Sequence, residues 1–113
     1  MIINVYHAEY PGSDSIDYVA AVDAPENLTI DEALEYAFRW TNNVDGSWSK
    51  GETFVFLGET VENGDFNQRV NCVANPHPQG YGTRSTSVGD WMVIGEDWYE
   101  VMPMGFRISN QAA

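Results

Sequence analysis

The side chains that could carry out catalysis are few and lie far apart in the sequence. Cys72 is the single cysteine, and it stands inside a predicted strand with no basic neighbour to activate its thiol. An isolated cysteine in such a place is typically a small core residue. His7 falls in another predicted strand and His77 in a proline-flanked loop, so their spacing is not that of a zinc site. We therefore expect no catalytic residue, no metal ligand and no cofactor.

Sequence motifs that build catalytic sites are also missing. The chain has no nucleophile elbow, glycine-rich phosphate loop, zinc-type histidine pair or calcium loop. Asp31 and Glu35 stand one helical turn apart and could share acid–base chemistry, but exposed helix carboxylates are ordinary solvated acids, and Glu35 can pair with Arg39. These patterns favour a protein that binds over one that catalyses.

Acidic residues are the main functional signal. They outnumber basic residues 17 to 5, which gives a formal net charge of −12. Residues 1–62 hold twelve acids and two basic residues, a net −10, whereas residues 63–113 hold five acids and three basic residues, a net −2. Such charge argues against direct binding to nucleic acid or to an anionic membrane. The expected partner is a protein with a basic surface.

The spacing of these acids can be compared with that of phosphates in DNA. Carboxylates three or four positions apart on a helix stand about 5–6 Å from each other, a separation of the same order as the ~3.4 Å rise per phosphate along one DNA strand. A helix face and the hairpin before it could therefore imitate a run of phosphates. The partner-binding residues that we expect are Asp17, Asp23, Glu26, Asp31, Glu32 and Glu35. The alternative is that the charge serves solubility alone.

Trp48 is a second candidate for partner binding. It stands in a polar loop, and aromatic residues in such loops are over-represented among binding anchors. The competing interpretation is that the Trp48 side chain folds back as a lid on the core.

Length and hydropathy indicate one α+β domain over residues 1–113. The chain is long enough for a single core, and its 43% hydrophobic residues can fill that core. Residues 2–9 and 16–23 predict a strand hairpin, in which Ile16, Tyr18, Ala20 and Val22 share one face. Further strands are expected at residues 53–57, 68–74, 91–95, 98–102 and 106–108, and a surface loop at 75–82.

The clearest helix signal runs from Thr29 to about Asn42. Thr29 and Glu32 have the spacing of a capping box, and the apolar residues between Ile30 and Trp40 fall on one broad side, opposite the acids. We therefore expect one major helix packed on a bent, mostly antiparallel β-sheet. No apolar run reaches the roughly 20 residues of a membrane span, and no signal peptide is evident, so a cytoplasmic location is expected.

The segment from Thr83 to Asp90, T-R-S-T-S-V-G-D, is followed by an apolar strand, a short turn, Tyr99 and the pair Gly105–Phe106. This pattern, over residues 83–108, resembles YodL-like domains. Small proteins with it recur in phages and conjugative elements, and the resemblance implies an accessory protein of a mobile element acting in a bacterial host cytoplasm. It brings no catalytic residues with it.

Charge and resemblance together predict a phage-type accessory protein that binds and inhibits a host defence or nucleic-acid-handling protein. Restriction or CRISPR machinery, a nuclease or RNA polymerase would be suitable targets, with nucleic-acid mimicry as the mechanism. The alternative is a non-enzymatic structural or assembly component of a virus or mobile element, acidic only for solubility.

Overall fold

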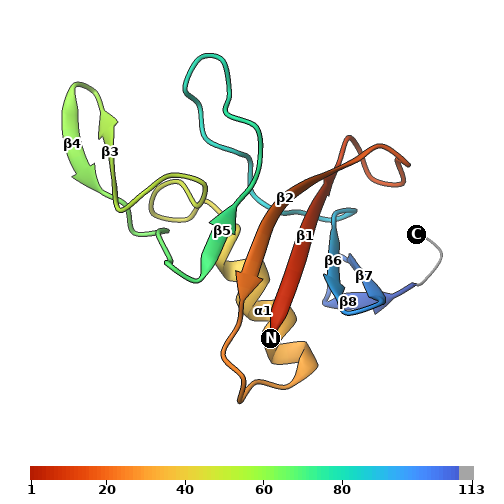
Figure 1. The fold of residues 1–113 in the computed structure, drawn as a ribbon. Coiled ribbons are helices and arrows are strands. Elements are labelled where there is room, and N and C mark those ends of the chain that lie inside the picture. The colour runs from red at the N-terminus through yellow and green to blue at the C-terminus, as the bar shows by residue number, and fades with distance from the viewer. Residues whose placement is uncertain (110–113) are drawn as a thin grey trace.

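A computed structural model describes residues 1–109 of the chain and shows one helix and eight strands in that range (Figure 1). In chain order the elements are β1 (Ile2–Ala8), β2 (Ile16–Asp23), α1 (Ile30–Trp40), β3 (Thr53–Phe56), β4 (Glu59–Glu62), β5 (Val70–Cys72), β6 (Trp91–Ile94), β7 (Asp97–Val101) and β8 (Phe106–Ile108).

Six of the strands form one antiparallel sheet in the order β5-β2-β1-β6-β7-β8. The first strand of the chain is therefore central, paired on one side with β2 and on the other with β6. The expected antiparallel sheet with a single helix is confirmed, although strands predominate and the fold is mostly β. Among the described residues, no helix is both long and apolar enough to cross a membrane.

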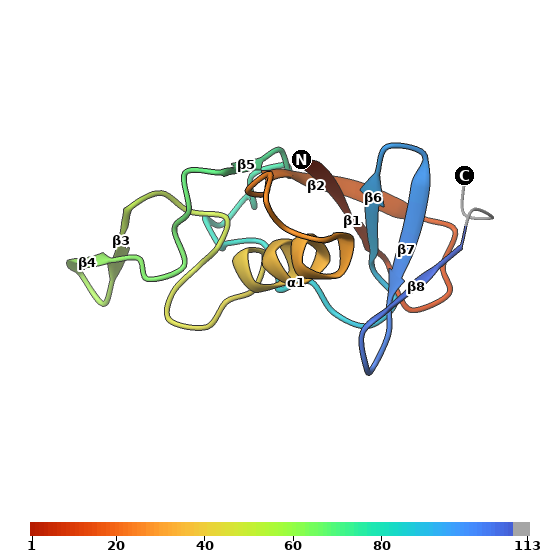
Figure 2. The same cartoon turned by 90° about the horizontal axis from the view of Figure 1, so that it is seen from below.

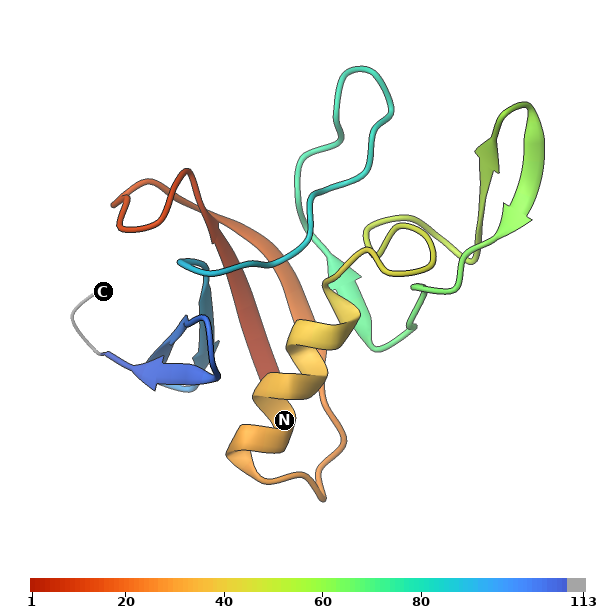
Figure 3. The same cartoon turned by 180° about the vertical axis from the view of Figure 1, so that it is seen from behind.

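Helix α1 crosses one face of the sheet beside β1 and β2 (Figures 2 and 3). Its predicted capping box is present: the Thr29 hydroxyl accepts a hydrogen bond from the Glu32 amide (3.2 Å), and the Glu32 carboxylate accepts one from the Thr29 amide (2.9 Å). The buried side of the helix joins the sheet in one hydrophobic core, because apolar surface removed from water is the main stabilising term in folding. The fully buried members of that core are Ile3, Val5, Ala20, Val22, Ala24, Ala33, Leu34, Ala37 and Met92.

The predicted β1–β2 hairpin is confirmed, but a bulge changes which residues face the core. Val5 pairs with Ala20 and Tyr6 pairs with Tyr18, so Val19 is an extra residue in β2. An extra residue in a strand reverses the faces on which the following side chains lie. The prediction that Tyr18 shares a face with Ala20 is therefore wrong: Tyr18 is 41% exposed, and its ring lies 5.1 Å from that of Tyr6.

Strands β3 and β4 form a separate two-stranded sheet that projects from the body of the molecule (Figures 1 and 3). Strand β4 was not expected from the sequence, because Glu59–Glu62 carries two charged residues and has little strand character. It forms because Leu57 and Gly58 both adopt positive φ angles, +52° and +81°. Two such residues match the tight type I′ turn that joins two strands directly.

Candidate functional site

The six acids predicted to bind a partner are all exposed, but the structure divides them. Asp23 and Glu26 lie beside the amino group of Met1, which is hydrogen-bonded to the Glu26 carboxylate and lies 3.5 Å from that of Asp23. The hydrogen bond with Glu26 is the largest of the effects that raise the pKa of this amino group. Arg69 also lies 4.0 Å from Asp23. These two carboxylates are therefore partly neutralised within the chain.

Asp17 lies apart from the other five acids. It stands at the opposite end of β2 from Asp23, six residues away, and a strand rises roughly 3.3 Å per residue. The two carboxylates are thus on the order of 20 Å apart along the strand. The expected continuous surface from the helix to Asp17 does not form.

Two acids in the first two turns of α1, Asp31 and Glu35, lack an ion pair among the described residues, as Asp17 does. Arg39 does not pair with Glu35 as the sequence indicated: its guanidinium lies 3.2 Å from the carboxylate of Asp65 and 4.1 Å from the ring centre of Trp40. Within residues 1–109, no basic group lies within 4.0 Å of Asp31 or Glu35. With Glu32 committed to the capping box, Asp31 and Glu35 are the acids of this face that are free to meet a cation. We call Asp31, Glu32 and Glu35 the acidic helix face.

Trp48 is buried, with 2% of its surface exposed. Its indole N–H donates a hydrogen bond to the carbonyl of Arg84 (2.8 Å), and its ring meets that of His7 edge-on at 6.2 Å. The interpretation of Trp48 as a lid on the core is therefore the one that the structure supports, and Trp48 is not available as an exposed binding anchor. The loop turns the side chain inward, and the Arg84 carbonyl satisfies the indole donor there.

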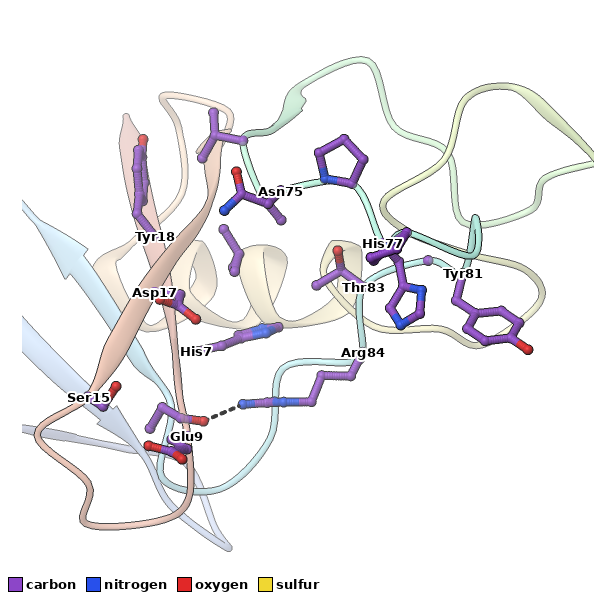
Figure 4. A pocket seen from close by; sticks show the side chains of 17 residues that line it. His7, Glu9, Ser15, Asp17, Tyr18, Asn75, His77, Tyr81, Thr83 and Arg84 are labelled. Atoms are coloured by element: carbon purple, nitrogen blue, oxygen red, sulfur yellow. Dashed lines mark hydrogen bonds between the residues drawn. The ribbon is translucent and has the colours of Figure 1, made fainter.

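An open groove of about 920 Å³ separates the β1–β2 hairpin from the loop that follows β5. Figure 4 shows polar side chains on its walls and Arg84 reaching across to the carbonyl of Ala8 (2.9 Å). The same guanidinium makes two further hydrogen bonds, of 2.7 and 2.8 Å, to the two oxygens of Asp90. Arg84 is thus occupied in holding the chain together. The labelled side chains of the groove are those of His7, Glu9, Ser15, Asp17, Tyr18, Asn75, His77, Tyr81, Thr83 and Arg84.

The buried polar groups beneath the groove form a structural network. His7 is 6% exposed and its Nε2 lies 2.9 Å from the hydroxyl of Thr86, which lies 2.8 Å from the hydroxyl of Thr41. Thr41 in turn donates to the carbonyl of Ala37 at the end of α1 (2.8 Å). Burial lowers the pKa of His7 to about 4, so its imidazole is neutral at pH 7. Each hydroxyl is committed to a buried partner, and the arrangement joins β1, α1 and residues 84–90.

Asp90 completes this network. Burial alone would raise the pKa of its carboxyl, but hydrogen bonds from Arg84 and from the amides of Ser87 and Ala8 outweigh burial and lower the pKa. Residues 84–90 are therefore explained by the hydrogen bonds that anchor this segment to β1 and α1. Within the described range, no three His, Cys, Asp or Glu side chains are grouped to hold a metal ion.

The β3–β4 hairpin carries an exposed apolar tip that sequence reasoning missed. Val55 is 68% exposed, Phe56 59% and Leu57 88%. The sequence predicted a strand at residues 53–57 but not its exposure, since a run of apolar residues does not itself distinguish a core strand from an exposed one. Leu57 also holds a left-handed backbone (φ +52°), which costs a non-glycine residue about 1–2 kcal/mol. The sequence signal that could have indicated this hairpin is the pair Leu57–Gly58, because Asn-Gly is the favoured pair in such a turn.

Two buried polar residues fix the base of this hairpin. Asn63 is 7% exposed; its amide group donates to the carbonyls of Ser47 (2.7 Å) and Gly51 (2.8 Å), and its side-chain oxygen accepts from the Ser47 amide (3.0 Å). Asp65 is fully buried, and one of its oxygens accepts three backbone N–H groups. These donors are Val44 (2.8 Å), Asp45 (3.0 Å) and Gly46 (2.7 Å).

Comparison with known proteins gave no match to a protein-family model, a curated protein or a solved structure.

Proposed function

We propose that this chain is a non-enzymatic accessory protein of a phage or related mobile element that inhibits a host nucleic-acid-handling protein by occupying its basic surface. The observation that carries the proposal is the state of the acidic helix face. Arg39, the nearest cation along the helix, is held by Asp65, so Asp31 and Glu35 remain exposed without an ion pair among residues 1–109.

Electrostatics supports a binding role for this face. Residues 24–38 contain four acids and no lysine or arginine. Helix α1 holds Asp31 and Glu35 one turn apart, with their Cβ atoms about 5–6 Å from each other, whereas charges on flexible loops would lose more conformational entropy on binding. Negative charge at a helix N-terminus is also favourable to the helix itself, so the face is stable before a partner arrives. A partner that normally binds phosphates offers the matching row of lysine and arginine side chains.

The experiment compares two charge reversals of equal size. Asp31→Lys/Glu35→Lys reverses the proposed face, while Glu96→Lys/Asp97→Lys reverses two exposed acids at the β6–β7 turn. The tagged chain is used to capture its partner from a bacterial host lysate, and association with the purified partner is then measured at rising salt and with duplex DNA as competitor. Glu32 is left unchanged because its side chain closes the capping box.

The proposal expects association to slow steeply as salt rises and DNA to compete. It also expects the reversal at 31 and 35 to weaken binding at least about 10-fold, as the loss of two close charge pairs would, and the reversal at 96 and 97 to change it little. Equal losses from both variants would show that total charge alone matters. If neither salt nor DNA changed the association, nucleic-acid mimicry would be refuted, and the alternative of an assembly component that is acidic for solubility would be favoured.

A further inference from the structure

The β3–β4 hairpin presents apolar side chains on all sides of its tip. Val55 pairs with Thr60 and Phe56 with Glu59, so consecutive positions face opposite sides of the two-stranded sheet. Leu57 stands at the turn between them. The tip is therefore an apolar knob, and a flat surface could cover only one of its sides. No residue of 53–62 belongs to the hydrophobic core of the described chain.

From this geometry we propose that the hairpin tip, Val55, Phe56 and Leu57, is a docking element that inserts into an apolar pocket of the partner protein, and that lysine or arginine side chains rim this pocket. The inference deepens the proposed function, because it adds a second contact and gives its chemistry. It does not depend on the acidic helix face, from which the hairpin is separate in the fold (Figure 3).

Backbone strain at Leu57 supports a role in binding. A tight turn with two positive φ angles favours Asn or Gly at its first position, yet this turn holds a leucine with 88% of its surface in water. Leucine there helps neither the turn nor the core. Strained residues persist where the surrounding structure enforces them, and an observed outlier of this kind points to function.

Hydrogen bonds at its base explain how a hairpin of low intrinsic stability can be preformed before binding. An isolated two-stranded hairpin is barely stable in water. Here the backbone N–H of Asn63 donates to the carbonyl of Glu52 across the base of the hairpin (2.8 Å). The buried side chain of Asn63 donates to backbone carbonyls of the loop 47–51. A preformed element loses less entropy when it binds.

Charge identifies the occupant as a protein with a basic rim. Residues 51–68 contain acids and no lysine or arginine. The hairpin acids are all exposed, with Glu59 next to the apolar tip and Glu52 and Glu62 at the base. A second copy of this chain would bring its own −12 charge against them. An anionic membrane surface would repel the same acids. An apolar pocket with lysine or arginine at its edge would bury the apolar tip and pair with the hairpin acids.

The test places a photo-cross-linking benzoylphenylalanine at residue 57 of the full chain, and a control benzoylphenylalanine at Met104, which is 92% exposed on the β7–β8 turn. Each is irradiated in a bacterial host lysate, and the cross-linked peptide is sequenced by mass spectrometry. Unlabelled full-length chains then compete: wild type, Val55→Thr/Phe56→Thr/Leu57→Asn, and Asp31→Lys/Glu35→Lys. A further competitor, Val44→Thr/Met104→Asn/Ile108→Thr, changes three exposed apolar residues elsewhere and is the matched control.

The proposal expects position 57, and not 104, to cross-link to an apolar segment of one heterologous protein with lysine or arginine nearby. Wild type and the matched control should compete, while the hairpin variant should compete roughly 30-fold less well, the loss typical of an interface anchor. The hairpin variant should fold as well as wild type, because threonine suits strands and asparagine suits the turn, and circular dichroism and thermal unfolding check this.

Several outcomes would overturn the inference. They are equal competition by the hairpin variant, equal cross-linking at 57 and 104, no cross-link at 57, a cross-link to a second copy of the chain, or binding to vesicles of phosphatidylcholine and phosphatidylglycerol that the hairpin variant loses. The charge-reversed competitor separates this result from the proposed function. If it competes as wild type while the hairpin variant does not, the docking element stands and the acidic helix face fails.

Discussion

Replacing Asp65 by alanine should remove the main anchor of the segment between α1 and β3. One carboxylate oxygen accepts the amides of Val44, Asp45 and Gly46 at 2.7 to 3.0 Å, and Asp65 is fully buried. A buried donor that loses its acceptor costs about 1–3 kcal/mol. Because Val44 and Asp45 are themselves exposed, water can reach their amides after the change, so the lower end applies to each. We expect the free energy of unfolding to fall by about 3 kcal/mol.

The ion pair with Arg39 adds little to that figure. The Arg39 side chain is 36% exposed and lies 3.2 Å from the buried carboxylate. Water screens the pair from the Arg39 side, so we expect the pair to contribute about 1 kcal/mol. Asp65→Asn, which removes the charge and keeps one acceptor oxygen, should therefore cost less than Asp65→Ala. The order of the two variants tests whether the amides or the charge dominate.

Urea denaturation followed by tryptophan fluorescence measures the change, and amide hydrogen exchange locates it. Exchange should accelerate first in residues 44–66, including the β3–β4 hairpin, while the amides of β1 and β2 stay protected. Asp45→Ala is the matched control, because it removes the same charge from an exposed position and should alter stability by no more than about 0.5 kcal/mol. A loss below about 1 kcal/mol for Asp65→Ala, or equal losses for the two variants, would refute the assignment of Asp65 as an anchor.

Three further changes test the core and the buried polar network. Leu34→Asp places a charge at a fully buried helix position and should unfold the chain, so native-like circular dichroism would contradict the packing of α1. Cys72→Ala should cost no more than about 1.5 kcal/mol, because Cys72 is only half-buried, and should leave partner binding intact; a folded variant without binding would show that the thiol takes part. Burial holds the pKa of His7 near 4, below its ordinary value of 6.5, so between pH 6.5 and 4 the unfolded chain takes up a proton that the folded chain does not. Stability should therefore fall by up to about 3 kcal/mol as pH drops through this window, and urea midpoints at pH 7, 5.5 and 4.5 should show a shallower decline for His7→Gln.

Local patterns in the sequence were sufficient for the helix and the first hairpin. The capping box at Thr29 and Glu32 and the apolar arc of α1 depend on residues a few positions apart, and both are present in the structure. The β1–β2 hairpin follows equally from its short connection. The bulge at Val19 was not predictable, because a bulge is set by how both neighbouring strands of β2 fit together, and strict alternation conceals it.

The electrostatic partners depended on contacts distant in sequence. Arg39 and Glu35 have the spacing of a helical ion pair, but Asp65, far along the chain, holds the guanidinium instead. The exposure of Leu57 was equally hidden, because an apolar run looks the same whether a core covers it or not. The acids near the N-terminus of α1 were placed correctly at the surface, since the apolar arc of the helix fixes which side meets water.

The central position of β1 has a consequence for synthesis on the ribosome. Its partner β2 emerges directly after it, but its other edge has no partner until residues 91–94 have been made. During that interval the nascent chain exposes a strand edge beside Ile3 and Val5, which are fully buried in the finished fold. Open edges of this kind pair with other chains. Proteins truncated before Trp91 should therefore accumulate as aggregates, whereas removing residues after β8 leaves every pairing of β1 in place.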